Sequence, residues 1–127
     1  MSDKRVLLLV EDDPLVGMAT LGLLEDLGYD VLGPAADSAE ALSLAKDERP
    51  DLLVTDINLR HHGDGLTLAA DLHDRLGLYS LFLSGDAPEA TILERKYTAG
   101  YLQKPYNRAK LGDAVQAALS RIAAAGA

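Results

Sequence analysis

The sequence contains no cysteine, and its apolar stretches, such as Val6–Val10, are short. The absence of cysteine excludes disulfides and thiolate chemistry. Apolar stretches of this length cannot cross a bilayer, which needs about 20 apolar residues in a helix. No basic-then-apolar leader opens the chain. We therefore expect a soluble cytoplasmic protein with no membrane insertion, folded as a single domain over residues 1–127 with its core in residues 4–122.

Basic side chains are also in the minority. The chain has 12 Lys and Arg against 20 Asp and Glu, for a formal net charge of −8. Binding to nucleic acid depends largely on Lys and Arg side chains that neutralise phosphates. The charge balance therefore argues against direct binding to nucleic acid, and by itself it indicates only a well-solvated surface.

Short apolar runs alternate with longer segments of helical periodicity. The runs that predict strands are Val6–Val10, Val31–Leu32, Leu52–Thr55, Leu81–Ser84 and Tyr101–Leu102. Strand–helix alternation repeated five times predicts parallel strands, right-handed crossovers and helices on both faces. The expected fold class is therefore α/β, a flavodoxin-like doubly wound five-stranded parallel sheet of order 2-1-3-4-5.

Helix positions follow from apolar spacing and from capping residues. The last helix is the clearest, with Leu111, Ala114, Val115, Ala118, Leu119 and Ile122 three or four residues apart. The small residues that follow it, Ala123–Ala127, are typical of a frayed end. The first helix is expected to end at Gly28 and to bury Val16, Thr20, Leu23, Leu24 and Leu27. Capping residues are expected at Asp37, with Glu40, for the second helix and at Asn107 for the fifth.

Polar residues follow four of the predicted strands, where the fold would bring them to one edge of the sheet. They are Glu11, Asp12 and Asp13, then Asp56, Ser84 and Lys104. Two carboxylates about 4 Å apart repel by roughly 4 kcal/mol at an effective dielectric near 20, so gathering Glu11, Asp12 and Asp56 requires a proton or a cation. Mg²⁺ suits a site with few carboxylates and several waters. Asp13 is better explained as a solvated acid at a helix start.

An acceptor carboxylate, a metal, a lysine and a hydroxyl are the groups that phosphoryl transfer to aspartate requires. At this point the sequence resembles a known family. Nearly the whole chain, from Lys4 to Ile122, is similar to response-regulator receiver domains of two-component signalling systems. The matching segments are L-L-L-V-E-D-D at 7–13, L-L-V-T-D-I-N-L at 52–59, L-F-L-S-G at 81–85 and G-Y-L-Q-K-P-Y at 100–106.

The resemblance implies a role for each residue of the set. Asp56 would be the phosphoacceptor, and Mg²⁺ would be bound by Asp56 and Asp12 directly, by Glu11 mainly through water and by the backbone carbonyl of Asn58. Ser84 would be the family's hydroxyl, Lys104 its phosphate-binding lysine and Tyr101 its switch aromatic. The Lys104–Pro105 bond would be cis. The function implied is a phosphoacceptor switch, not an enzyme, that receives a phosphoryl group from a histidine kinase or a histidine phosphotransfer protein and acts on an unknown downstream protein.

The chain departs from the family pattern after the acceptor. Arg60 stands where many relatives have proline, and the loop at 60–65 is one residue longer than the commonest pattern. Its His61 and His62 could suggest a transition-metal site, but adjacent histidines on a Gly-rich loop are usually solvated. His73 lies in a helical pattern without the context that phosphohistidine chemistry needs.

Two alternative functions remain open. Enzymes of the haloacid-dehalogenase type also phosphorylate an Asp after an apolar strand, but their second Asp is replaced here by Asn58, which cannot shuttle protons. A receiver-like module that binds partners without being phosphorylated would have the same fold, but no expected site residue is missing here.

Overall fold

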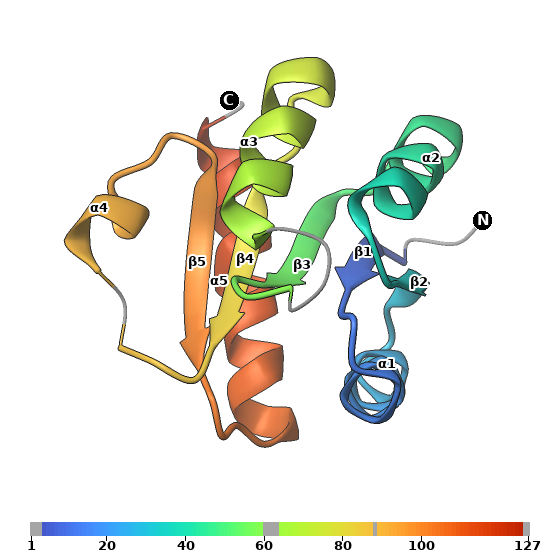
Figure 1. Ribbon diagram of the computed structural model, residues 1–127. Helices are drawn as coiled ribbons and strands as arrows, with labels where there is room; N and C mark the ends of the chain where they lie inside the picture. Colours follow the sequence, from blue (N-terminus) through green and yellow to red (C-terminus); the bar gives the residue numbers. More distant parts are fainter. Residues whose placement is uncertain (1–3, 60–63, 88, 126–127) are drawn as a thin grey trace.

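The computed structural model describes residues 4–59, 64–87 and 89–125. Strands and helices alternate along the chain (Figure 1), in the order β1 (Val6–Val10), α1 (Pro14–Asp26), β2 (Asp30–Ala35), α2 (Ser38–Glu48), β3 (Leu52–Asp56), α3 (Gly65–Leu76), β4 (Ser80–Ser84), α4 (Ala90–Leu93), β5 (Thr98–Gln103) and α5 (Arg108–Ala125). All five predicted strands are present, and four of them extend by one or more residues beyond the apolar runs.

The strands form one sheet of order β2-β1-β3-β4-β5, and every neighbouring pair is parallel. The predicted fold class and strand order are therefore confirmed. Because the strands are parallel, their carboxyl ends share one edge of the sheet, where the arrowheads of Figure 1 lie. The central strands β1 and β3 are buried almost throughout, as strands covered on both faces must be.

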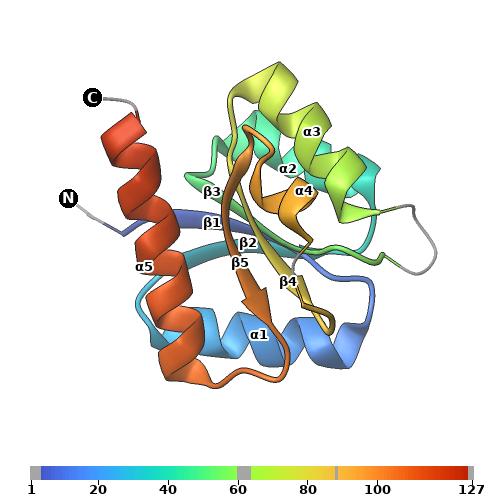
Figure 2. The ribbon, with the colours of Figure 1, turned by 90° about the vertical axis from the view of Figure 1, so that its left-hand side faces the viewer.

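Two apolar cores separate the sheet from its helices. One core joins Leu8, Leu53 and Phe82 of the sheet to α2, α3 and Ile92 of α4. The other joins Leu7, Val54 and Leu81 to α1 and α5. The view of Figure 2 shows α1 and α5 together on one side of the sheet. Alternate residues of each strand thus serve opposite faces, which is why the predicted strands are nearly continuous in apolar character.

The buried face of α1 differs from the predicted one at its start. Thr20 and Leu24 are buried as expected, but Val16 is 36% exposed. Gly17 is buried instead, and a Cβ at that position would lie only 3.1 Å from the ring of Pro34. The prediction for Val16 was wrong because the start of α1 faces Pro34 with Gly17 and not with Val16.

The predicted caps are confirmed. The carboxylate of Asp37 accepts a hydrogen bond from the backbone N–H of Glu40, and Asn107 accepts one from that of Lys110. Gly28 follows α1 with a φ of +95°. The helix α5 continues through Ala125, so the expected fraying from residue 123 onward was wrong for residues 123–125. Alanine has the highest helix propensity, which explains this extension.

The helix α4 is only one turn long. The Thr98 hydroxyl donates to the backbone carbonyl of Ile92 at 2.7 Å, and the Arg95 N–H donates to the same carbonyl at 3.2 Å. In a longer helix that carbonyl would accept from the N–H of Lys96, four residues further on. The first residue of β5 thus helps to end α4, and less helical surface covers the outer edge of the sheet.

Candidate functional site

The centre of the site is an ion pair between Asp56 and Lys104. Asp56 is the last residue of β3, Lys104 directly follows β5, and β4 lies between them. The Lys104 Nζ atom lies 2.6 Å from Asp56 Oδ2, and the pair is largely shielded from solvent. Burial acts to lower the pKa of Lys104, but the hydrogen bond and charge of Asp56, with the charge of Glu11, outweigh it and raise that pKa. The lysine is therefore firmly cationic.

The carboxylate of Asp56 is held through both oxygens. Its Oδ1 atom accepts a hydrogen bond of 3.1 Å from the backbone N–H of Asn58, while Oδ2 accepts from Lys104. The backbone N–H of Lys104 also donates to the Ser84 carbonyl at 2.7 Å, which fixes the start of the lysine side chain relative to β4. Such contacts hold the carboxylate in one orientation.

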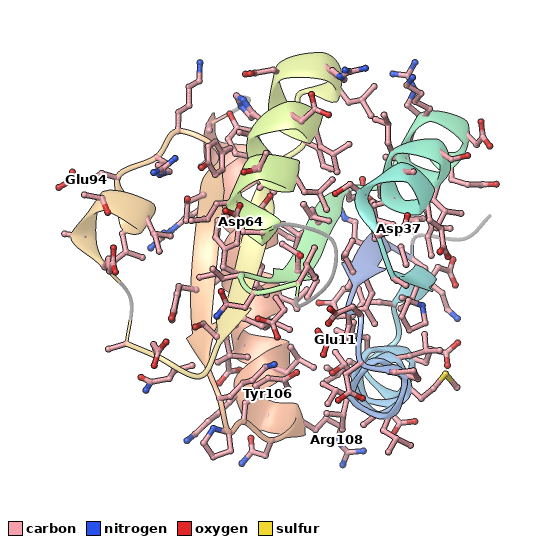
Figure 3. The ribbon with its side chains drawn as sticks, in the orientation of Figure 1. Glu11, Asp37, Asp64, Glu94, Tyr106 and Arg108 are labelled. Carbon is pink, nitrogen blue, oxygen red and sulfur yellow. The ribbon has the colours of Figure 1, made fainter. Side chains whose placement is uncertain are left out.

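Glu11 brings a second acid to the same place. It directly follows β1, is 9% exposed, and its backbone N–H donates to the Ala35 carbonyl at 2.9 Å. Figure 3 shows Glu11 beyond the end of β1. Burial is the largest cause that raises the pKa of Glu11 to about 7, and the negative charges of Asp56 and Asp12 add to it. The edge therefore carries more negative charge than Lys104 neutralises.

Ser84 and Tyr101 are linked through Asp86. The Ser84 hydroxyl, which is almost fully buried, accepts a hydrogen bond of 3.2 Å from the backbone N–H of Asp86. The Tyr101 hydroxyl donates to the backbone carbonyl of Asp86. The two side chains therefore bond to the two backbone polar groups of one residue, and a change at Ser84 can reach Tyr101 through that residue. Because Asp86 lies three residues before the N-cap position of α4, it does not cap that helix.

Sequence reasoning missed Gly65 and Thr55. A Cβ at position 65 would lie 2.1 Å from the Asp56 carbonyl oxygen, so only glycine fits there. The Gly65 N–H donates to the Ile57 carbonyl at 2.6 Å, and the buried Thr55 hydroxyl donates to the Asp56 carbonyl at 3.0 Å. The sequence Asp64-Gly65 could have indicated this position, because Asp64 caps α3 and a glycine at the first helical position is unusual enough to mark a close contact.

The remaining predicted positions have different fates. Asp13 caps α1, accepting hydrogen bonds from the backbone N–H groups of Leu15 and Val16. It is therefore an acid at a helix start, as predicted. The Lys104–Pro105 bond is cis as expected, and Gly33–Pro34 is a second cis bond that was not foreseen. Arg60, His61 and His62 lie outside the described residues. His73 lies in α3, with its ring edge-on to Tyr79.

The oxygen donors of Glu11, Asp12, Asp56 and Asn58 suit a hard divalent cation. Their side chains alone do not form a complete coordination shell. Within the described ranges, no three His or acidic side chains are grouped closely enough to hold a metal ion by themselves. Magnesium commonly keeps several waters and takes few protein ligands, so it needs no such cage. The raised pKa of Glu11 shows that its ionised form is destabilised here, and a cation would relieve that cost.

Comparison with known proteins agrees with this geometry. The family model described as the response regulator receiver domain matches residues 7–116. The chain belongs to the response-regulator receiver family. Receiver domains are signalling domains that accept phosphoryl groups and generally bind Mg²⁺ at an acidic site, and they are not enzymes in the usual sense.

Relatives of this receiver domain include transcriptional regulators. It is 31% identical to the transcriptional regulatory protein PdtaR of Mycobacterium tuberculosis over 120 residues, which cover 92% of this chain and 58% of that protein. It is 31% identical to the phyllosphere-induced regulator PhyR of Methylorubrum extorquens over 114 residues, which cover 89% of this chain and 43% of that one. The receiver domain thus spans about half the length of these curated relatives.

Solved structures share the fold. The signal receiver domain of a modulated diguanylate cyclase from Desulfovibrio desulfuricans superposes with a TM-score of 0.81 at 34% identity, covering 94% of this chain and 96% of that one. The response regulator PhyR from Brucella abortus superposes with a TM-score of 0.84 at 25% identity, covering 97% and 51%. None of the helices in the described part of the chain is long and apolar enough to cross a membrane.

Proposed function

We propose that this receiver domain is a switch that accepts a phosphoryl group on Asp56. The observation that carries the proposal is the contact of 2.6 Å between Asp56 Oδ2 and the Lys104 ammonium at the edge where β1, β3, β4 and β5 end. The ammonium orients the carboxylate before reaction, and it can then bind an oxygen of the phosphoryl group that arrives.

The reaction that this site supports is transfer from a phosphohistidine. One Asp56 oxygen attacks phosphorus in line, the P–N bond breaks, an acyl phosphate forms and the released imidazole takes up a proton. Glu11, Asp12, Asp56 and the Asn58 carbonyl are the groups that would hold Mg²⁺. The cation supplies charge neutralisation for the phosphoryl oxygens when it is bound. The Ser84 hydroxyl, which accepts a hydrogen bond from the Asp86 N–H, would donate its own hydrogen to one of those oxygens.

The partner that supplies the phosphoryl group would be a histidine kinase or a histidine phosphotransfer protein. A groove of about 460 Å³ runs beside the site between α1 and the segment after β5, and Lys104 itself lines it. Leu15 in this groove is 84% exposed, and Tyr106 closes it with a hydrogen bond of 3.0 Å to Thr20. An apolar groove next to the acceptor suits the apolar stripe of a helix that carries the phosphohistidine.

The response to phosphorylation would be a shift in the surface made by α4, β5 and α5. The link from Ser84 through Asp86 to Tyr101 supports this route, because Tyr101 lies on β5. A downstream protein that recognises one state of this surface would shift the equilibrium between the two states.

The test is phosphorylation by acetyl phosphate with Mg²⁺, followed by intact mass. We expect the wild type to gain one phosphoryl group and a folded Asp56→Asn variant to gain none. Asp51→Asn serves as the control, because Asp51 lies just before the same strand, far from its carboxyl end. If wild type and Asp56→Asn are labelled equally, the acceptor assignment is wrong. If the wild type takes no phosphoryl group from acetyl phosphate or a cognate kinase, the chain is a binding module instead.

A further inference from the structure

A second cavity, of about 340 Å³, lies away from the phosphorylation site, and we call it the distal cavity. Polar residues that line it are Tyr79 just before β4, Lys96 just before β5, Thr98 at the start of β5 and Arg121 near the end of α5. In the views of Figures 1 and 2 the carboxyl end of α5 lies at the opposite end of the molecule from the arrowheads of β4 and β5. The distal cavity therefore lies where β4 and β5 begin, far from Asp56.

The charge in this cavity is positive and uncompensated. Lys96 and Arg121 are both exposed, and within residues 4–59, 64–87 and 89–125 neither makes an ion pair or a hydrogen bond. Of the residues that the structure describes, no acidic one lines the cavity. By contrast, Lys4, Arg5 and Arg108 each have an acidic partner. Two cations that share one cavity favour an anion between them.

The shape of the cavity suits a ligand with an apolar body. Ala99, Ile122 and Ala125 supply apolar lining. The Tyr79 ring packs edge-on against His73, with ring centroids 5.1 Å apart, so the aromatic wall is fixed. Among the described residues the Tyr79 hydroxyl has no hydrogen-bond partner, and it adds a third donor beside the two cations. Ligand pockets commonly combine an apolar lining with a few polar groups in this way.

We propose that the distal cavity is a binding site for a small organic anion. Lys96 and Arg121 bind its carboxylate or phosphate group, and Tyr79 and Ile122 contact its apolar or aromatic body. Arginine binds both kinds of anion through two parallel hydrogen bonds, and lysine adds a point charge. The site is separate from the acidic edge around Asp56, so its ligand does not need the phosphorylation chemistry.

The test is an NMR titration of the whole chain in Mg²⁺-free buffer with benzoate and with phenyl phosphate. Acetate and inorganic phosphate are the matched probes without an apolar body. We expect the amide resonances of residues 79, 96–99 and 121–125 to shift, with the aromatic anions binding at least about tenfold more tightly than acetate and phosphate. The Lys96→Gln/Arg121→Gln double variant should lose at least about tenfold in affinity for both aromatic anions.

The control is a Lys46→Gln/Lys110→Gln double variant, which removes the same charge from two exposed lysines outside the cavity. It should bind like the wild type, and so should Asp56→Asn, which separates this site from the phosphorylation site. Shifts confined to residues near Lys104, or equal weakening by both double variants, would overturn the proposal. So would the absence of anion binding together with a concentration-dependent change in sedimentation that depends on Lys96 and Arg121, since that result would mark a contact between copies.

Discussion

Lys104 and Asp56 are far apart in the chain, and their ion pair ties the segment after β5 to the end of β3 across the intervening strand. The pair has two consequences. Before any phosphoryl group arrives, Lys104 offsets part of the negative charge at the acidic edge. When one arrives, the same ammonium must turn from the carboxylate to the new anion, so the segment that carries it responds to the change.

The charge balance predicts opposite effects of two substitutions in metal-free buffer. Lys104→Met should lower the free energy of unfolding by about 2 kcal/mol, because the carboxylates of Asp56 and Glu11 lose their cation in a partly buried place. Asp12→Ala should raise it by up to about 1 kcal/mol, because one repelling charge is removed. Urea unfolding with EDTA measures both. Mg²⁺ should stabilise the wild type more than Asp12→Ala, and equal Mg²⁺ affinity by calorimetry in the two proteins would contradict the ligand assignment.

Glu11 predicts a pH dependence of stability. Its folded-state pKa of about 7 lies above its ordinary value of 4.5, so the folded protein binds this proton more tightly than the unfolded chain. Without metal, the penalty for the ionised form is absent below pH 4.5, grows as the pH rises to 7 and stays at up to about 3 kcal/mol above it. Glu11→Gln should remove this fall between pH 4.5 and 7, as urea midpoints would show. Glu25→Gln, an exposed change on α1, should leave it in place.

Gly65 predicts a steric limit beside the acceptor. A methyl group at this position would meet the Asp56 carbonyl, so Gly65→Ala should cost at least about 2 kcal/mol and slow phosphorylation by displacing Asp56. Gly22→Ala is the matched control, since a Cβ there meets nothing within 4 Å. It should stabilise α1 by about 0.5–1 kcal/mol and leave phosphorylation unchanged. A stable Gly65→Ala protein with normal labelling would show that the close approach is not required.

The Ser84–Asp86–Tyr101 connection predicts a transmitted change. Beryllofluoride, which stands in for the phosphoryl group, should shift amide resonances around Thr91–Tyr106. Tyr101→Phe removes the hydroxyl that bonds to Asp86 and should reduce the shifts in β5 while leaving those beside Asp56. Tyr29→Phe, at the far side of the sheet, is the control. If the wild-type shifts stay confined to the loops that touch Asp56, no switch is transmitted.

The lifetime of the phosphorylated form should depend on Asn58 and Asp86. Both line one cavity of about 240 Å³ that Ser84 also lines, so water in it would lie beside the acceptor. Attack on phosphorus must come from the side opposite Asp56, and the Asn58 amide can position that water. Asn58→Leu or Asp86→Leu should slow the decay of purified phosphoprotein in Mg²⁺. Identical decay of both variants and the wild type would show that this path does not control hydrolysis.

The fold was predictable because its signals are local and repeated. The apolar runs marked the strands, and Asp37 and Asn107 marked the starts of two helices. The resulting strand–helix alternation was enough to predict the order of the sheet. With that order, the positions of Asp56, Lys104 and Glu11 at strand ends were enough to place them at one edge. The exposure of Val16 was not predictable, because it depends on a long-range contact between α1, at Gly17, and Pro34 of β2. Gly65 and the short α4 depend likewise on long-range contacts, with the Asp56 carbonyl and with Thr98. The metal-binding roles, the switch role of Tyr101 and the cytoplasmic location stay predictions.

The chain is held by backbone bonds at both ends of the loop that follows Asp56. Asn58 and Asp64 form an antiparallel bridge, and the Gly65 N–H bonds to the Ile57 carbonyl, so the chain is clamped on both sides of residues 60–63. We therefore expect a change of loop length between these two positions to have little effect on the position of Asp56. In protein engineering, an insertion between these two bonds, such as a short epitope, would be expected to leave Asp56 in place.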